Sequence, residues 1–376
     1  MNKLLRFSFD TVPKGKVAVL EAETSSWPEI KEILKEFTPL ELPTSRPIYR
    51  VQTIRASLSL ALRHHIRPGF AQLGALCDRA EVRALIATDG GHREHIDVLN
   101  RLLPRLTQVL ISHGSVRVDN IVNAKHVPNN SQQILVAWGN ADVDTYRKAG
   151  VTSPRMVVAG SLRNSFYWAL YRSRELSTKK EYPISLVSNF ADLEEETSSR
   201  LVRSRVMRMM KVHLARYCKE RHLPIRILLR PGLSGQMLHG AREREIRHFK
   251  EIFAEVPFSY SDVSRPYATY IDSDLSDVTI GVPSGSLTES FARGNKVLMF
   301  GQNPSDGDYL GFPRGGPYLL HEPSYEVFAE RLDLIREMST GSFADQFKAD
   351  REYVVANATS DKAIQVILDL IREQVD

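Results

Sequence analysis

The sequence has few of the features that would place it in a specialised class. Only two of its 376 residues are cysteines, Cys77 and Cys218, which excludes a disulfide framework or a cysteine-rich zinc site and favours a reducing, cytoplasmic setting. No apolar run reaches the length of about 18 residues that a membrane-spanning helix needs. The N-terminal segment lacks the apolar core and cleavage site of a signal peptide. We therefore expect any membrane attachment to be peripheral.

Several catalytic motifs are also missing. No Gly-x-Gly-x-x-Gly follows the first predicted strand and no Gly-Lys-Ser/Thr phosphate loop is present, which disfavours dinucleotide-dependent dehydrogenases and P-loop enzymes. The absence of a Gly-x-Ser-x-Gly elbow argues against an α/β-hydrolase. Asp272-Ser273-Asp274 matches the Asp-x-Asp motif of metal-dependent sugar transferases in sequence, but it precedes a predicted strand instead of following one.

Charge is nearly balanced, with 50 Lys and Arg against 45 Asp and Glu and a net charge of +5. This small excess favours an anionic partner. Because no aromatic-basic stripe or RNA-binding signature occurs, we expect no nucleic-acid partner. The composition is that of a globular protein, and the length corresponds to about two domains.

Short apolar runs alternate with longer amphipathic segments, a pattern typical of α/β proteins with parallel sheets. The first series of predicted strands is Val17–Leu20, Ala84–Thr88, Gln108–Ser112, Ile134–Ala137 and Met156–Val158, and the second is Ile184–Val187, Arg226–Leu229, Val278–Gly281 and Lys296–Phe300. Helices are predicted at Glu29–Glu36, Thr53–Arg63, Arg93–Leu103 and Ala141–Ala149, and then at Glu194–Arg221, Ala241–Phe253, Ser286–Arg293 and Tyr325–Met338.

A polar linker at Ser173–Pro183 separates the two series. We therefore predict two Rossmann-like domains that face a cleft, residues 1–178 and 179–350, with a C-terminal helix in 351–376 that crosses back onto the first domain. Ligands of such domains bind at the C-terminal ends of the strands.

The most informative segment is Asp277–Gly301, which reads strand, small-residue turn, helix and strand. Ser284, Gly285 and Ser286 would leave backbone N–H groups open at a helix N-terminus, where the helix dipole favours an anion. The Thr288 hydroxyl adds a donor. Ser286 and Glu289 have the spacing of a capping box, and a carboxylate at Glu289 in the first turn can accept hydrogen bonds from ribose hydroxyls. The alternative is a well-capped βαβ unit without a ligand.

Two further segments place ionisable side chains directly after predicted strands. Asp89 follows one strand and precedes Gly90-Gly91-His92, and His113 follows the next with Gly114 beside it. A carboxylate at this position can act as a general base or as a nucleophile, and an imidazole as a proton carrier. The alternatives are that Asp89 caps the next helix and that His113 is structural. His92 and His95 are three residues apart without a carboxylate cluster, so no metal site is expected.

Polar residues follow other predicted strands in the same way. Arg230, before Pro231-Gly232, can bind a diphosphate or a carboxylate, or else forms a surface ion pair. Ser188 and Asn189 would line the nucleotide pocket. In the turn after Met156–Val158, Ser161 or Arg163 would reach the cleft, or the turn is purely architectural.

A basic helix spans residues 200–221. Its cations are Arg200, Arg203, Arg205, Arg208, Lys211, Arg216, Lys219 and Arg221. They form either a solvated helix face or a patch that holds anionic lipid headgroups at the inner face of the cytoplasmic membrane.

A family resemblance rests on short blocks in a fixed order. These are His113-Gly114, Ala137-Trp138-Gly139, Gly150-Val151, Val158-Ala159-Gly160-Ser161, the serine-rich block from Ser284 to Ser290, and Arg293-Gly294-Asn295-Lys296-Val297-Leu298. This order resembles the two-domain (GT-B type) glycosyltransferases of bacterial surface polysaccharide synthesis. The serine block is also similar to transferases that use CMP-activated ulosonic acids such as Kdo, and to sialyltransferase-like enzymes, which carry His-Pro where this chain has Arg230-Pro231.

The resemblance implies a nucleotide-activated sugar donor bound by the C-terminal domain, a glycan or lipid-linked glycan acceptor bound by the N-terminal domain, and no metal or other cofactor. Carried over by position, Ser284, Ser286, Thr288 and Glu289 would serve the nucleotide, while Asp89 and His113 would face the reacting centre. Three alternatives stay open. They are a nucleotide-sugar epimerase of the same architecture, a CDP-glycerol-type phosphotransferase, and a non-catalytic glycan-assembly protein.

Overall fold

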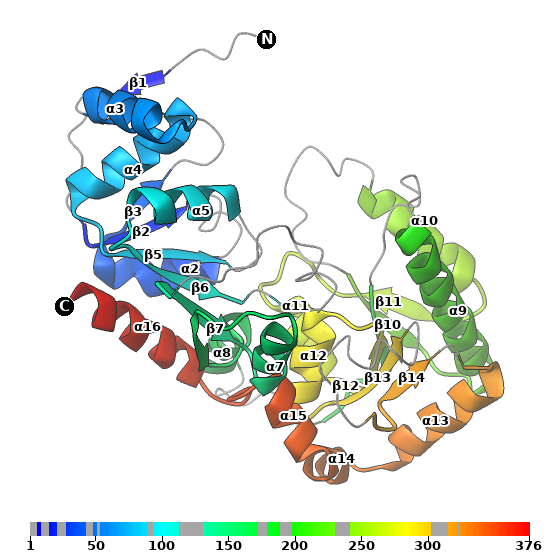
Figure 1. Ribbon diagram of the computed structural model, residues 1–376. Helices are drawn as coiled ribbons and strands as arrows, with labels where there is room; N and C mark the ends of the chain where they lie inside the picture. Colours follow the sequence, from blue (N-terminus) through cyan, green and yellow to red (C-terminus); the bar gives the residue numbers. More distant parts are fainter. Residues whose placement is uncertain are drawn as a thin grey trace. The chain divides into compact units, whose positions relative to one another are not determined.

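The computed structural model describes residues 6–8, 15–20, 28–42, 48–50, 53–88, 93–112, 114, 131–171, 179–188, 198–229, 241–301, 315–321 and 323–376. The chain forms two compact units (Figure 1). The first unit comprises Met1–Trp138, Val143–Phe166 and Ser360–Asp376, and the second comprises Gly139–Asp142 and Tyr167–Thr359.

The first unit contains a six-stranded parallel sheet. Its strand order is β3 (Leu40–Leu42), β2 (Val17–Leu20), β5 (Ala84–Thr88), β6 (Thr107–Ile111), β7 (Gln133–Ala137) and β8 (Arg155–Val158). The central strands are mostly apolar because side chains that point to opposite faces are nearly all buried. A separate parallel pair joins β1 (Arg6–Ser8) to β4 (Ile48–Arg50).

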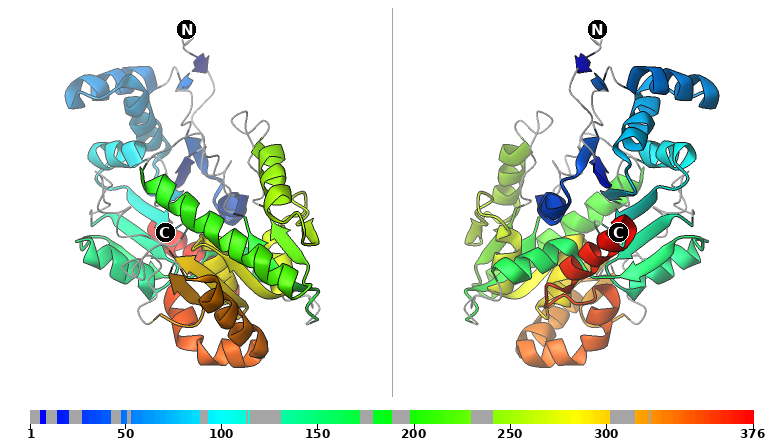
Figure 2. Two further views of the ribbon diagram at one scale, coloured as in Figure 1. Left: turned by 90° about the vertical axis from the view of Figure 1, so that its right-hand side faces the viewer. Right: turned by 90° about the vertical axis from the view of Figure 1, so that its left-hand side faces the viewer.

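Two layers of helices bury the two faces of this sheet. Ala18, Leu85 and Leu110 pack with α4 (Pro68–Ala80), α5 (Arg93–Leu102) and α7 (Asn140–Lys148). The alternate residues Val19 and Ile86 pack with α2 (Pro28–Ile33), which continues as the 3-10 helix η1 (Leu34–Phe37), with α8 (Leu162–Leu170) and with α16 (Lys362–Val375). The C-terminal helix α16 thus lies beside β5 and β6 of the first sheet (Figure 2).

The second unit has its own six-stranded parallel sheet. The order is β11 (Phe258–Tyr260), β10 (Ile225–Leu228), β9 (Tyr182–Val187), β12 (Ser276–Gly281), β13 (Lys296–Gly301) and β14 (Leu319–His321). One face is covered by α9 (Ser198–Glu220), α10 (Ala241–Ile252) and α13 (Tyr325–Glu337). The other is covered by α11 (Ala268–Asp274), α12 (Gly285–Ala292), α14 (Thr340–Gln346) and α15 (Lys348–Val354).

The expected fold class is confirmed, because both sheets are parallel and alternate with helices along the chain. All nine predicted strands are present, with ends that differ by at most two residues. The elements that the pattern missed are mainly short or at sheet edges: β3, β11 and β14 have three residues each. The pattern also missed helix α4. Among the described residues, no helix is long and apolar enough to cross a membrane.

Candidate functional site

The strand orders place a topological switch point in each sheet. In the second sheet the chain runs outward from β9 to β10 and β11 on one side, and from β12 to β13 and β14 on the other. In the first sheet the reversal falls between β2 and β5. Ligands of open α/β sheets bind beyond the carboxyl ends of the strands at such a point. Ser188 directly follows β9, and the Val282–Ser286 turn follows β12.

The β12–α12 turn is held tightly against the strand before it. A Cβ at Gly281 would lie 3.2 Å from the Val187 Cβ and 3.3 Å from Leu287 Cδ2, so a glycine suits this crossing of β12 and β9. Ser284 caps α12, with its hydroxyl accepting a hydrogen bond from the Leu287 N–H at 3.4 Å. The cap predicted for Ser286 is therefore at Ser284, two residues earlier, and Ser286 is inside the helix.

Of the predicted donor-binding residues in this segment, three are partly exposed and two are buried. Ser284, Gly285 and Ser286 are partly exposed at the first turn of α12, where backbone N–H groups lack partners within the helix. The Thr288 side chain is fully buried, and its hydroxyl donates to the Ser284 carbonyl at 3.0 Å. The Ser284–Ser286 turn is therefore accessible at the N-terminus of α12. The Thr288 hydroxyl is not, because it already donates its hydrogen bond to the Ser284 carbonyl.

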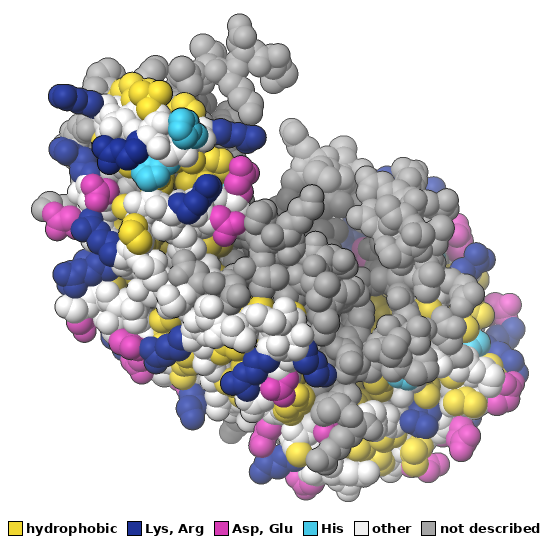
Figure 3. All heavy atoms as spheres, in the orientation of Figure 1, with side chains coloured by type: hydrophobic (Ala, Val, Ile, Leu, Met, Phe, Trp, Pro, Cys, Tyr) yellow, Lys and Arg dark blue, Asp and Glu magenta, His cyan; other side chains and the backbone are white. Residues whose placement is uncertain are grey.

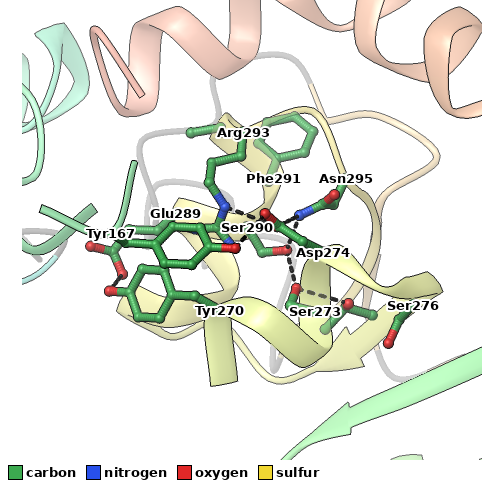
Figure 4. A network of polar contacts seen from close by, with 12 residues as sticks. Tyr167, Tyr270, Ser273, Asp274, Ser276, Glu289, Ser290, Phe291, Arg293 and Asn295 are labelled. Carbon is green, nitrogen blue, oxygen red and sulfur yellow. Dashed lines mark hydrogen bonds and ion pairs between the residues drawn. The ribbon is translucent and has the colours of Figure 1, made fainter. Parts of the chain in front are cut away.

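Glu289 differs from its predicted placement. It lies one turn into α12, not in the first turn, and it is buried. Its carboxylate accepts a hydrogen bond of 2.6 Å from the Tyr270 hydroxyl (Figure 4). In this arrangement the carboxylate ties α12 to α11. The prediction that Glu289 lies in the first turn of the helix is therefore wrong. Its side of α12 faces the protein interior, where it contacts Tyr270.

Behind the turn lies a buried polar network (Figure 4). The Asp274 carboxylate pairs with Arg293 at 3.0 Å and accepts hydrogen bonds from the Tyr167 hydroxyl at 2.8 Å and the Asn295 amide at 2.5 Å. Ser290 lies between Asn295 and Ser273. A buried carboxylate with three donors is a well-satisfied group, so the network fixes α12 and thereby the orientation of its N-terminus.

Arg293 is held from two sides. Its guanidinium lies over the rings of Tyr167 and Tyr270, at 5.0 and 4.8 Å from their centres. Burial, the largest cause, would lower its pKa, but Asp274 together with Tyr167, Tyr270 and Glu289 outweighs burial, and the pKa of Arg293 is raised. Arg293 therefore keeps its charge at all ordinary pH values.

The residue after β9 is engaged as well. Ser188 is buried, and its hydroxyl donates to the Glu245 carboxylate, which also accepts from Arg242 at 2.6 Å. Next to it, the buried Lys211 ammonium lies 3.0 Å from Nε2 of His248. Burial lowers the pKa of Lys211 to about 8, and burial together with the charge of Lys211 lowers the pKa of His248 to about 4. In this structure the Ser188 hydroxyl thus links the end of β9 to Glu245 of α10 by a hydrogen bond.

The first unit holds the predicted acceptor residues Ser161 and Arg163. Gly160 has a positive φ of 107°, and the Ser161 hydroxyl accepts from the Asn164 N–H at 3.3 Å, which starts α8. Arg163 forms an ion pair of 3.4 Å with the buried Glu29 of α2. Both residues therefore make contacts within the first unit, and the turn has a clear architectural role.

Trp138 and Gly139, which belong to the blocks that carry the family resemblance, also make structural contacts. The Trp138 indole donates to the Ser112 carbonyl at 3.0 Å. A Cβ at Gly139 would lie 2.3 Å from the Tyr353 carbonyl oxygen, so the close approach of α15 requires glycine.

The remaining predicted site residues lie outside the described part of the chain. These are Asp89, His92, His113, Asn189 and Arg230. In the sequence, Asp89 comes directly after the last residue of β5, and His113 comes two residues after the last residue of β6. Within the described ranges, no three His, Cys, Asp or Glu side chains form a group that could hold a metal ion.

The described cations of the basic helix α9 are largely engaged. Arg216 pairs with Glu220 at 2.8 Å and lies over Tyr325, while Lys219 pairs with Glu255 and Arg221 with Asp333. Lys211 points inward to His248. These pairs favour the ion-paired helix face over the lipid-binding patch, as far as the described side chains go.

The sequence pattern does not predict the network around Asp274 or the contact between Lys211 and His248. Asp274 precedes a strand, and Arg293 and Asn295 belong to the block that follows the serine-rich turn. These polar residues flank two apolar strands, but their spacing does not indicate which of them face inward.

Comparisons with known proteins agree with this fold. No protein-family model matches the sequence, and no curated protein shows significant similarity to it. Among solved structures, the chain is similar to the UDP-GlcNAc 2-epimerase of Neisseria meningitidis bound to UDP-GlcNAc (TM-score 0.55, 10% identity, 95% of this chain and 99% of that chain). It is also similar to a glycosyltransferase of Rickettsia africae (0.54, 12%, 96% and 99%) and to the wall teichoic acid polymerase TagF (0.53, 14%, 96% and 90%). The chain therefore has the two-domain α/β (GT-B type) fold.

Proposed function

We propose that the protein is a cytoplasmic glycosyltransferase that moves a sugar from a nucleotide-activated donor to a surface polysaccharide or lipid-linked glycan. The observation that carries the proposal is the Ser284–Ser286 turn, which is partly exposed at the N-terminus of α12 beside the switch point of the second sheet. Backbone N–H groups and the helix dipole at this position suit a donor phosphate. The similarity in fold to a glycosyltransferase supports this choice.

The donor in our proposal is a cytidine nucleotide, CMP-Kdo or a related ulosonic acid, because the serine block resembles that of enzymes using such donors. The second candidate is a CDP-glycerol-type phosphotransferase. It is favoured by the similarity to the wall teichoic acid polymerase, which was also solved after a soak with CDPG (TM-score 0.52, 14% identity). Both candidates bind a cytidine nucleotide and differ in the group transferred.

The residues proposed for chemistry are Asp89 and His113. Asp89 would accept the proton of the acceptor hydroxyl or attack the donor carbon, and His113 would carry a proton to or from the departing phosphate. Asn189 and Arg230 would bind the donor with the Ser284–Ser286 turn, and His92, Ser161 and Arg163 would border the acceptor. Cations and N–H groups would take the phosphate charge without a metal ion.

A thermal-shift series with CMP, CDP, UDP, GDP and dTDP tests the donor class. A ligand at 100 times its Kd raises the apparent free energy of unfolding by about 2.7 kcal/mol. We expect CMP and CDP to raise the melting temperature and the other nucleotides to have little effect. Ser286→Ala should reduce the shift without lowering the melting temperature of the free protein, because its hydroxyl has only a 3.4 Å contact with Ser284.

Other outcomes separate the alternatives. A shift with UDP together with interconversion of UDP-GlcNAc, followed by NMR without an acceptor, would support the epimerase instead. The fold similarity to a UDP-GlcNAc 2-epimerase makes this comparison necessary. A protein that responds to none of the five nucleotides would contradict the transferase and leave the non-catalytic assembly protein.

A further inference from the structure

Helix α3 (Ile54–His64) lies on the outside of the first unit, where it packs against α4 (Figure 1). Its inward face is fixed by buried polar contacts. The Ser57 hydroxyl is 2.5 Å from Oε1 of Gln72, and the Gln72 amide donates to the Thr53 hydroxyl at 2.6 Å. Ser57 and Ala61 are buried against α4. The orientation of α3 about its own axis is therefore determined.

The opposite face of α3 carries large apolar side chains. Leu58 is 52% exposed and Leu62 is 77% exposed, the most exposed of the large hydrophobic residues in the described chain. They are four residues apart, and Arg55 lies three residues before Leu58, so all three share one stripe of the helix. The space-filling view shows apolar side chains over this helix beside cationic and histidine side chains (Figure 3).

The segment of sequence that carries this stripe contains cationic side chains and no acidic ones. From Leu42 to Cys77 the sequence contains no Asp or Glu. The same segment contains Arg46, Arg50, Arg55, Arg63, His64, His65 and Arg67. Arg55, Arg63, His64, His65 and Arg67 are exposed on or next to α3.

We propose that α3 is a membrane-docking helix that lies in the interface of an anionic bilayer. Leu58 and Leu62 would enter the boundary between headgroups and acyl chains, and Arg55, Arg63 and Arg67 would contact lipid phosphates. An amphipathic helix with apolar residues on one stripe and cations beside them binds bilayers in this way. Each cation near an anionic surface strengthens binding roughly fivefold. The assignment does not depend on the transferase proposal.

The charge pattern argues for lipid over a second copy of this chain. In a symmetric dimer the same patch would face itself, and the arginines around Leu58 and Leu62 would then repel one another. The exposed apolar residues of α13 provide a contrast. Val327 and Leu334 are 45% and 48% exposed, but α13 also carries Glu326, Glu330 and Glu337. Among the described residues, Leu58 and Leu62 form a pair of exposed leucines, one helical turn apart, in an arginine-rich segment that has no acidic residue.

Vesicle sedimentation of the full chain tests the surface. We expect binding to phosphatidylglycerol–phosphatidylcholine vesicles, weak binding to pure phosphatidylcholine, and release by high salt. Leu58→Ser with Leu62→Ser should weaken binding at least about tenfold, and Arg63→Glu with Arg67→Glu should do the same. The matched controls in the second unit are Val327→Ser with Leu334→Ser, and Arg247→Glu with Lys250→Glu. They should bind as the parent does.

A fluorescent label gives a readout of depth. Cys77 and Cys218, the only cysteines of the chain, are both buried, and burial raises their thiol pKa values to about 12. An environment-sensitive dye will therefore attach selectively to Leu62→Cys, or to the control Leu334→Cys. Anionic vesicles should shift the emission of the label at residue 62 to the blue and leave that at residue 334 unchanged.

Three results would overturn the proposal. One is equal binding of the α3 variants and their controls, and the second is an unshifted label at residue 62. The third is self-association of the free protein that Leu58→Ser with Leu62→Ser abolishes and vesicles do not disrupt, which would assign the stripe to a dimer. Because all variants are at exposed positions, circular dichroism should show unchanged helix content, so a loss of binding reports on the surface itself.

Discussion

Asp274 and Arg293 form an ion pair of 3.0 Å between side chains that are 1% and 2% exposed. The pair joins the C-terminal end of α11 to the residue that follows α12. Tyr167 and Asn295 donate to the same carboxylate. Because α12 presents the candidate phosphate-binding turn at its other end, this pair positions the site without touching a ligand.

Removing the cation should be costly. Arg293→Met would leave the Asp274 carboxylate buried with only neutral donors, and losing one partner of a buried pair costs about 3–5 kcal/mol. Urea unfolding of the second unit should show this loss as a lower midpoint. Adding Asp274→Asn to Arg293→Met should restore part of it, because the unpaired charge is gone.

The control is Arg372→Met. Arg372 pairs with Glu36 and Asp369 at the surface and is 44% exposed, so its loss should cost only about 0–1 kcal/mol. Equal midpoints for Arg293→Met and Arg372→Met would show that the buried pair does not stabilise the fold.

A second prediction concerns Gly139. A Cβ there would lie 2.3 Å from the Tyr353 oxygen and 2.6 Å from the Val354 carbonyl carbon, both backbone atoms. Gly139→Ala should therefore destabilise the protein by about 1–3 kcal/mol, as overpacked sites do. In contrast, Gly341→Ala in α14 meets nothing closer than 3.9 Å and should be neutral or stabilising by up to about 1 kcal/mol. Thermal unfolding of the two variants distinguishes them, and a stable Gly139→Ala would contradict the close contact with α15.

The strands of both cores could be predicted because burial on two faces leaves an uninterrupted apolar run. Ala84–Thr88 is an example, with every residue buried. The edge strands were not predictable in this way. Phe258–Tyr260 has three residues, and its side chains are only partly buried or exposed. Such a segment is a strand because β10 offers it hydrogen bonds, which no local pattern records.

The site was predictable in position but not in side-chain detail. The Ser-Gly-Ser turn follows from small residues between a strand and a helix. Which way Glu289 points depends on the Tyr270 hydroxyl 19 residues earlier. The sequence places Lys211 among the cations of a basic helix, yet the side chain is buried and its ammonium lies 3.0 Å from Nε2 of His248 on another helix. The orientations of Glu289 and Lys211 depend on partners that only the fold brings close. Because these partners are far away in the sequence, the orientations could not be predicted from it.

A third prediction separates the capping role of Ser284 from ligand binding. Asp is as good a cap as Ser, and a carboxylate favours a helix N-terminus, so Ser284→Asp should keep the free energy of unfolding. Ser284→Ala should lower it by about 1 kcal/mol. For nucleotides the expectation changes, because a carboxylate at the turn repels phosphate. Ser284→Asp should therefore lose most of the thermal shift given by CMP or CDP. A full shift in Ser284→Asp would place the phosphate elsewhere.

The last prediction is a pH dependence that arises from His248. Burial and the nearby charges of Lys211 and Arg208 lower its pKa from 6.5 to about 4 in the folded protein. Between these two values the unfolded chain binds more protons, so the free energy of unfolding should fall as the pH decreases from 6.5 to about 4. The side chain is only partly buried, which reduces the expected loss to about 1–2 kcal/mol. His248→Gln should remove this part of the acid sensitivity in urea unfolding curves.

The cause can be tested by NMR titration of the imidazole. Lys211→Met removes the closer cation and should raise the pKa of His248 toward 6.5, while Arg208→Gln should raise it less, because Lys211 has the larger effect. Lys211→Met should also not destabilise the protein at pH 7, since an apolar side chain of similar length replaces a buried charge. If Lys211→Met left the imidazole titration unchanged, the contact of 3.0 Å between the ammonium and Nε2 would not be what holds His248 neutral.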